Sequence, residues 1–314
     1  MTEIALTLQQ WNGVEFPHVL AGSSSLPDYL AANGTVVSEQ LAASGAILFR
    51  GFDVADSETF DAAVRAYGAP GFTYAESLSN AVRVNVTDRV FTANEAPPDT
   101  SIYLHHEMAQ TPIYPSKLFF FCEIAADEGG ATPLCRSDIL LDRLRQSDRA
   151  FVDRLEREGV RYTNIMPASD DVGSGQGRSW RSTLDATSRE DAETRLRKLG
   201  YDWEWQEDDS LRATTPVLDA VRQLRDGRTV FFNQLIAAFR GWSDSRNDPS
   251  RAIRFGGGEP ITLTDMTEAI RLSDDLTFDM PWQSGDVVLV DNFLVMHGRR
   301  PFSGKRRVLA SLIS

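Results

Sequence analysis

The sequence predicts a mainly β fold with helical decoration. Short apolar segments of strand length, such as 46–52, 116–124 and 287–292, recur along the chain, and amphipathic helical segments and turn signals separate them. No internal repeat, low-complexity stretch or clear linker divides the chain, so we expect one domain over residues 1–314. The specific expectation is a double-stranded β-helix, or jelly roll, whose mouth can hold a metal between strands distant in sequence.

The N-terminal part contains two predicted helices and two predicted strands. A serine at 24 or 25 stands near the start of the first helix, and Ser57 opens the second. In chain order we expect a strand at 3–8, a helix at 26–44, a strand at 46–52, a helix from Ser57 to about Gly68, and irregular backbone at 69–101.

The remainder of the chain alternates in the same way. Its predicted strands lie at 116–124, 201–205, 211–215, 229–233, 287–292 and 306–313. A turn in 128–134, followed by another strand, is also predicted. Its predicted helices lie at 137–159, 188–200 and 261–272, and a polar, glycine-rich surface loop is predicted at 170–176.

The composition excludes several classes of partner. A net charge of −13 argues against a nucleic-acid surface and gives no support for binding to anionic membranes. The two cysteines, Cys122 and Cys135, are too few for a disulfide framework. The N-terminus lacks the basic and apolar regions of a signal peptide, and no apolar run approaches the ~18 residues of a membrane span. We therefore expect a cytoplasmic protein with no nucleic-acid or membrane partner.

The four histidines of the chain are placed in a way that predicts a metal site. His105 and His106 are adjacent and precede Glu107, and His297 follows the apolar run 287–292. Two histidines and one carboxylate form the facial triad that holds non-haem Fe(II) and leaves the opposite face open for chemistry. Residues i and i+2 of an extended strand point to the same side, so the spacing selects His105 over His106 as the partner of Glu107.

Other interpretations fit parts of this pattern. A His-x-Glu pair occurs often by chance, and His297 alone could cap a helix or lie in a loop. A Zn(II) hydrolase could use two histidines and a glutamate, but the helical His-Glu-x-x-His that is common in such sites is absent. A non-catalytic, cupin-like small-molecule binding protein would keep the barrel. Metal content separates zinc from iron, and product release separates an enzyme from a binding protein.

Several motifs, each weak alone, occur in the order in which a known family carries them. They are Gly45–Phe52, Leu104–Met108, Gly129–Pro133, Phe232–Gln234, His297–Phe302 and Gly304–Arg307. Through them the chain resembles, over nearly its whole length, the taurine/2,4-D dioxygenase superfamily of Fe(II)/2-oxoglutarate oxygenases. Within that superfamily it is similar to the clavaminate-synthase-like branch, which carries Glu rather than Asp in the triad.

The resemblance implies the reaction. Fe(II) would be held by His105, Glu107 and His297, and 2-oxoglutarate and O2 would be consumed to hydroxylate an unactivated C–H bond, with release of succinate and CO2. Halogenating relatives lack the carboxylate ligand. Glu107 therefore favours hydroxylation, or another oxidation such as desaturation, over chlorination.

The resemblance also implies how 2-oxoglutarate is held. Thr132 would hydrogen-bond one of its carboxylates, with a turn threonine as the alternative. An arginine near the chain end would pair with the 5-carboxylate, because its planar fork suits two-point contact. Arg306 takes this role from its place after Gly304, or Arg307 does if the preceding loop is shorter. Adjacent strand residues face opposite ways, so only one of the two should point inward.

The substrate residues are less sharply indicated. Asn94 and Glu95 lie in the loop ahead of the triad, Arg178 and Arg181 follow a glycine-rich loop interpreted as a lid, and Asn233 ends a predicted strand. Each has an ordinary alternative: a solvated loop, a charged surface loop or a buried turn. Relatives in the branch act on amino acids, free or tethered to a carrier protein. The expected partner is therefore a small carboxylate substrate, such as an amino acid, free or presented on a carrier protein.

Overall fold

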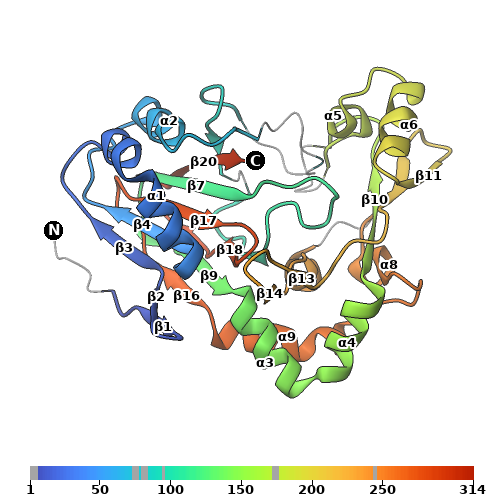
Figure 1. Ribbon diagram of the computed structural model, residues 1–314. Helices are drawn as coiled ribbons and strands as arrows, with labels where there is room; N and C mark the ends of the chain where they lie inside the picture. Colours follow the sequence, from blue (N-terminus) through green and yellow to red (C-terminus); the bar gives the residue numbers. More distant parts are fainter. Residues whose placement is uncertain (1–5, 73–77, 79–83, 94–95, 172–176, 243–245) are drawn as a thin grey trace.

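Two sheets packed face to face form the core of the molecule (Figure 1). The structure, a computed structural model, describes residues 6–72, 78, 84–93, 96–171, 177–242 and 246–314. The larger sheet has the order β3 (His18–Ala21), β4 (Ala46–Arg50), β17 (Val287–Asp291), β7 (Lys117–Ile124), β20 (Arg307–Ile313) and β5 (Phe91–Thr92). The facing sheet has the order β16 (Phe278–Met280), β9 (Thr132–Arg136), β18 (Val295–Arg299) and β6 (Ile102–His105).

A second group of elements stands beside these sheets (Figure 1). Its sheet has the order β11 (Asp202–Trp205), β12 (Leu211–Thr214), β10 (Val160–Met166) and β15 (Ile253–Phe255). Two-stranded sheets are formed by β1 (Gln9–Trp11) with β2 (Val14–Phe16), β13 (Arg222–Gln223) with β14 (Thr229–Val230), and β19 (Phe302–Ser303) with β8 (Glu128–Gly129). The described helices are α1 (Leu26–Ser44), α2 (Ser57–Ala66), α3 (Ser137–Ser147), α4 (Arg149–Glu158), α5 (Trp180–Leu184), α6 (Arg189–Lys198), α7 (Leu235–Gly241), α8 (Pro249–Ala252) and α9 (Leu263–Asp275).

Strand β7 shows how the large sheet serves two apolar layers. Phe119 and Phe121 point outward into the core covered by α1 and α2, where the rings of Phe60 and Phe121 stack with centroids 5.3 Å apart. Phe120 belongs to the core between the two sheets, and its ring centroid lies 5.2 Å from that of His297. Alternate side chains of a strand point to opposite faces, so one buried strand fixes both layers.

The first helix has the termini that the sequence predicts. The Ser25 hydroxyl accepts a hydrogen bond from the Asp28 backbone N–H at the start of α1, and Gly45 ends the helix with φ = 89°. A Cβ at Gly45 would lie 2.6 Å from Cγ2 of Val295. Glycine therefore lets the end of α1 pack directly on β18, the strand that carries His297. A capping box between Ser188 and Asp191 starts α6 in a similar way.

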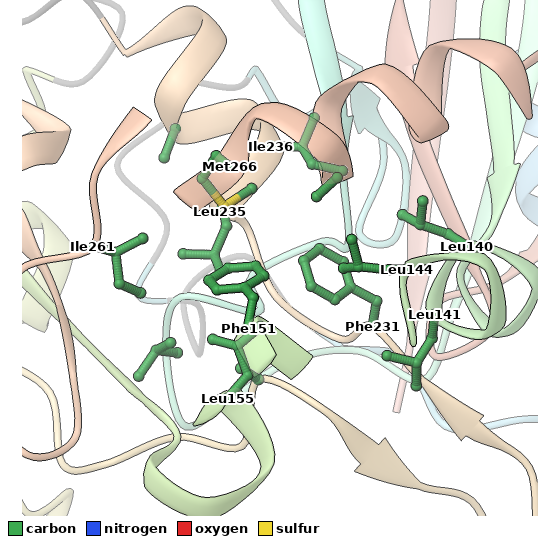
Figure 2. Close-up of a cluster of buried hydrophobic side chains, with 14 of the residues drawn as sticks. Leu140, Leu141, Leu144, Phe151, Leu155, Phe231, Leu235, Ile236, Ile261 and Met266 are labelled. Atoms are coloured by element: carbon green, nitrogen blue, oxygen red, sulfur yellow. The ribbon is translucent and has the colours of Figure 1, made fainter. Parts of the chain in front are cut away.

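A buried apolar cluster joins the helices α3, α4, α7 and α9 (Figure 2). Leu144 of α3, Phe151 of α4, Leu235 of α7 and Met266 of α9 belong to it, together with Ile253 of β15. Full burial of each such side chain contributes about 1.5–3 kcal/mol. The cluster thereby packs α7 against β15, a strand of the sheet formed by β11, β12, β10 and β15.

The helix predicted over 137–159 is two helices. α3 ends at Ser147 and α4 begins at Arg149, because Asp148 adopts φ = −141° and its carboxylate accepts a hydrogen bond from the Phe151 backbone N–H. A side chain that caps a new helix stops the preceding one. The apolar periodicity continues across the break, so the pattern of apolar residues does not reveal it.

Most predicted strands are one or two residues shorter in the structure, and the differences are larger at the N-terminus and at 229–233. Residues 1–5 lie outside the described residues and 6–8 are not a strand; the first strand is β1, which an Asn12-Gly13 turn joins to β2. The strand predicted at 229–233 ends at Val230, and Asn233, whose Oδ1 accepts from the Leu235 backbone N–H, lies just before α7. The last strand begins one residue late, at Arg307.

The described part of the chain contains no helix that is both long enough and apolar enough to cross a membrane. Cys122 and Cys135 are buried free thiols, and burial raises the pKa of the Cys122 thiol to about 12. Both cysteines are therefore packing residues in the protonated form.

Candidate metal centre and co-substrate pocket

His105 and His297 are brought together by strand pairing. They are direct partners across the antiparallel strands β6 and β18, and their ring centroids lie 4.4 Å apart. The sequence places His297 where one strand runs out, but β17 ends at Asp291 and His297 lies within a separate strand of the facing sheet. At the next residue, a Cβ on Gly298 would lie 2.3 Å from the Ile102 carbonyl oxygen, so glycine permits this close pairing.

Glu107 completes the group from a turn. Its Oε2 lies 3.7 Å from His105 Nε2 and 3.6 Å from His297 Nε2, and one ligand atom of each residue lies within 4.8 Å of the others. Glu107 and His297 are buried, and His105 is half-buried. β6 ends at His105, and Met108 has φ = 60°. The side chains therefore converge, although Glu107 is not part of an extended strand as the spacing argument assumed.

The hydrogen bonding of His105 leaves the right nitrogen for a metal. Its Nδ1 lies 2.8 Å from the Tyr103 carbonyl oxygen. A carbonyl only accepts, so Nδ1 carries the proton and the Nε2 lone pair faces Glu107. Two imidazole nitrogens and one carboxylate oxygen that approach one metal position from the same side are a ligand set that fits non-haem Fe(II).

His106 faces away from this group and holds the backbone behind it. It is fully buried, its Nδ1 lies at hydrogen-bond distance from the Asn292 carbonyl oxygen, and its Nε2 contacts the Ser137 hydroxyl at 2.6 Å. Burial lowers the pKa of His106 to about 3, and its contacts with the carbonyls of Asn292 and Phe231 offset only part of this effect. A neutral His106 therefore locks the strand that carries His105.

Asn292 positions Glu107, and nothing in the sequence pattern signalled it. Its Oδ1 accepts from the Glu107 N–H at 2.7 Å, and its Nδ2 donates to the carbonyls of Glu107 at 3.0 Å and Pro115 at 2.8 Å. Asn292 is fully buried and stands in the connection from β17 to β18. It therefore joins the segment of His297 to the turn of Glu107. Gln234, whose Nε2 donates to the His106 carbonyl, supports the same segment.

Replacing Asn292 with alanine is expected to weaken Fe(II) binding about 10- to 100-fold, the usual cost of losing a residue that orients a ligand. It should also lower the free energy of unfolding by about 3 kcal/mol, because three buried main-chain groups lose their partner. Anaerobic Fe(II) titration and urea unfolding measure the two effects. Asn247→Ala is the control: Asn247 is buried and bonds the Ile165 backbone, so it should lose stability without losing Fe(II) affinity.

Thr132 lines the core between the sheets. It is buried in β9, two residues before Leu134, which pairs with His297. Residues two apart in a strand share a face, so Thr132 lies on the Leu134 side, in the interior. Its Oγ1 accepts a hydrogen bond from Trp282 Nε1 at 3.0 Å. The hydroxyl proton thus stays available to an acceptor such as a carboxylate.

Arg306 and Arg307 have opposite environments. Arg307 is exposed and forms an ion pair with Glu123. Arg306 is half-buried, and its Nε donates to the Gly130 carbonyl at 3.1 Å. Burial, and the nearby Arg299, lower the pKa of Arg306 to about 10. Within the described residues no carboxylate forms an ion pair with Arg306, so its desolvated charge is available to a bound anion.

The residues predicted to contact substrate have varied positions. Asn94 and Glu95, and most of the predicted lid, lie outside the described residues. Arg178 donates to the Ser182 hydroxyl and backbone carbonyl, and exposed Arg181 stacks on Trp180.

Asn233 is buried and bonds only to main chain in the contacts described: it donates to the Ala220 carbonyl and accepts from the Leu235 N–H. The buried-turn alternative accounts for both of these contacts. A substrate role for Asn233, as for Arg178 and Arg181, stays a prediction.

The chain is similar to a known protein family over most of its length. Residues 14–312 match the family described as taurine catabolism dioxygenase TauD, TfdA family. The chain belongs to this family. It is 43% identical over 270 residues to a clavaminate synthase-like protein of Arabidopsis thaliana, covering 86% of this chain and 81% of that protein. It is 30% identical over 291 residues to the dapdiamide synthesis protein DdaC of Enterobacter agglomerans, covering 88% and 84%.

Solved structures confirm the jelly-roll fold of this TauD-family chain. PvcB of Pseudomonas aeruginosa, an Fe, alpha-ketoglutarate dependent oxygenase, matches with a TM-score of 0.53 and 14% identity over 98% of this chain and 89% of that one. An asparagine oxygenase in complex with Fe(II), 3-hydroxyasparagine and succinate matches with a TM-score of 0.55 and 13% identity, over 91% and 79%. At such identities the likeness shows the fold alone.

The family membership decides between the classes of function that the sequence left open. The protein is a 2-oxoglutarate-dependent dioxygenase, with Fe(II), 2-oxoglutarate and O2 as its cofactors and co-substrates. The zinc hydrolase and the non-catalytic binding protein are therefore set aside. The His105–Glu107–His297 group is a site with the donors that such a dioxygenase needs.

Proposed function

We propose that this dioxygenase hydroxylates an unactivated C–H bond of a small carboxylate substrate, an amino acid either free or attached to a carrier protein. The observation that carries the proposal is the convergence of His105, Glu107 and His297 at the edge of the core, with Glu107 supplying the carboxylate that chlorinating relatives lack. The similarity to a protein named for dapdiamide synthesis supports a small-molecule substrate. We treat residues 1–314 as one functional domain.

In this proposal the residues of the chain bind and orient Fe(II) and 2-oxoglutarate. His105, Glu107 and His297 hold Fe(II) on one face. Thr132 donates its hydroxyl proton to a carboxylate of 2-oxoglutarate, and Arg306 pairs with the other carboxylate. Bound Fe(II), 2-oxoglutarate and O2 supply the oxidising chemistry.

The two sheets exclude water around these groups. Phe120 packs against the His297 ring, and the core between the sheets is apolar on the strands that surround it. Apolar, low-dielectric surroundings of this kind strengthen the charged contacts beside them. The protein therefore contributes geometry and water exclusion, and the iron and its co-substrate contribute reactivity.

The decisive experiment is anaerobic addition of Fe(II) and 2-oxoglutarate to the purified protein. A weak visible charge-transfer band is expected, and then succinate release in a screen that begins with amino acids. Folded, metal-loaded protein without the band and without 2-oxoglutarate binding would contradict the assigned site. A band without succinate release above background for any amino acid, whether free or loaded on a carrier protein, would leave the site in place and contradict the substrate class.

A further inference from the structure

The segment that connects β16 to β17, residues 281–286, carries a half-buried tryptophan that contacts Thr132. The Trp282 Nε1 N–H donates to Thr132 Oγ1 at 3.0 Å. Met280, two residues earlier, pairs with Thr132 across the antiparallel strands β16 and β9. An indole N–H only donates, so the hydroxyl oxygen is the acceptor of this bond. The chain therefore leaves β16 and turns back so that the indole bonds the side chain opposite that strand.

The bond from Trp282 restricts the direction of the Thr132 hydroxyl proton. A threonine hydroxyl rotates about its C–O bond and can direct its proton to any nearby acceptor. One lone pair of Oγ1 faces the indole, so the proton must point elsewhere. A carboxylate offers only acceptors, and a hydroxyl oriented in this way presents the donor that a carboxylate requires. Because the orientation exists before the co-substrate arrives, less ordering is needed when it binds.

A buried ion pair holds the main chain on both sides of Trp282. Arg50, the last residue of β4, donates from Nε and Nη2 to the two carboxylate oxygens of Asp286 at 3.0 and 2.6 Å. The same Nη2 donates to the Pro281 carbonyl at 3.0 Å, and Asp286 Oδ2 accepts from the Gln283 N–H at 2.8 Å. These two groups belong to the peptide bonds before and after Trp282. One ion pair therefore fixes both peptide groups of the tryptophan.

The position of this ion pair fits a role in fixing conformation. Asp286 is 1% exposed, and the side chain of Arg50 is 16% exposed. A buried ion pair often stabilises a fold no more than apolar side chains of the same volume would, but its two-point contact defines a single geometry. Arg50 belongs to the motif Gly45–Phe52, which supplies no residue to the triad or to the pocket of Thr132 and Arg306. The pair connects that motif to Thr132 through Trp282.

We propose that Trp282 is a positioning residue for the co-substrate. Held by the Arg50–Asp286 pair, its indole N–H orients the Thr132 hydroxyl so that the hydroxyl donates to a carboxylate of 2-oxoglutarate. The inference rests on the proposed function, which assigns that carboxylate contact to Thr132. Trp282 acts through Thr132 and makes no contact of its own with 2-oxoglutarate in this assignment.

The test measures the Kd for 2-oxoglutarate by titrating the charge-transfer band of the full-length, Fe(II)-loaded protein without oxygen. Thr132→Val should weaken binding about 10-fold or more, the cost of a hydrogen bond to a charged group. Trp282→Phe, which keeps an aromatic ring and loses the donor, should weaken it about 3- to 10-fold. In the Thr132→Val background the same change should add less than about twofold, because residues that act through one another are not additive.

Trp205→Phe is the matched control. Trp205 is also half-buried, and its indole N–H donates to Glu193 Oε1 at 2.8 Å, in the sheet formed by β11, β12, β10 and β15 and its neighbouring helix α6. This variant should bind 2-oxoglutarate as the parent does. Arg50→Lys keeps the charge and loses the fork, so it should weaken binding about 3- to 10-fold and add little to Trp282→Phe. Anaerobic titration should give the parental Fe(II) affinity in every variant.

Three results would overturn the positioning role of Trp282. They are an unchanged Kd in Trp282→Phe while Thr132→Val raises it, a double variant whose effect is the product of the two single effects, and an equal loss of Fe(II) affinity in Trp282→Phe, which would indicate general damage to the core. Parental binding in Arg50→Lys would overturn the role of the ion pair. If Thr132→Val itself bound 2-oxoglutarate as the parent does, the Thr132 contact of the proposed function would fail. The two failures are therefore distinguishable.

Discussion

His297→Ala is expected to weaken Fe(II) binding by more than about 100-fold and to abolish succinate formation. Removal of a residue that merely orients a ligand already costs about 10- to 100-fold, and His297 supplies a ligand atom itself. Only His105 and Glu107 would remain at the centre, and two ligands no longer define one face of the metal. Anaerobic Fe(II) titration and a succinate assay with 2-oxoglutarate in excess measure the two losses.

The fourth histidine of the chain provides the control for this experiment. His18 lies in β3, at the edge of the large sheet, and is not part of the triad. His18→Ala should therefore bind Fe(II) as the parent does. His105→Ala should match His297→Ala, since both residues donate one nitrogen to the same centre. Turnover that survives in His297→Ala, with a normal circular dichroism spectrum, would show that the triad is assigned to the wrong histidines.

The sequence contained enough to select the three residues that the structure brings together as candidate metal ligands, but not their local structure. The chain has only four histidines, so few combinations of ligands are possible. The i, i+2 spacing of His105 and Glu107 places both side chains on the same side of an extended backbone. The turn at Glu107 depends on Asn292, which is 185 residues away in sequence. No sequence pattern predicts the hydrogen-bond partner of a single asparagine after a buried strand. This positioning residue could therefore be found only from the three-dimensional structure.

The choice between Arg306 and Arg307 shows a second limit of sequence patterns. Strand alternation states that one of two neighbours points inward, but the pairing of β20 with β7 shifts register between Arg307 and Val308. Such a bulge changes which side chains share a face, and the alternation of apolar residues does not reveal it. The helix break at Asp148 was missed for the same reason, because a single capping side chain decided it.

Arg306→Met is expected to raise the KM for 2-oxoglutarate by about 30-fold or more. Loss of one partner from a desolvated, hydrogen-bonded charge pair costs about 2–5 kcal/mol, and each 1.4 kcal/mol is a factor of ten. Methionine keeps much of the apolar stem, so packing against the Phe302 ring, which lies under the Arg306 guanidinium, changes little. Steady-state kinetics with varied 2-oxoglutarate measure the effect, with Arg306→Lys intermediate because lysine keeps the charge and loses the fork.

Arg307→Met separates a specific role of Arg306 from a general effect of positive charge. Both variants remove one arginine from the same strand end, so the net charge changes equally. Arg307 is exposed and paired with Glu123 on the surface, and an exposed ion pair contributes about 0–1 kcal/mol. Its loss should leave the KM for 2-oxoglutarate within about twofold of the parent value. If Arg307→Met raised that KM and Arg306→Met did not, the inward and outward roles of the two arginines would be reversed, and the co-substrate pocket would have to be placed on the Glu123 side of the sheet.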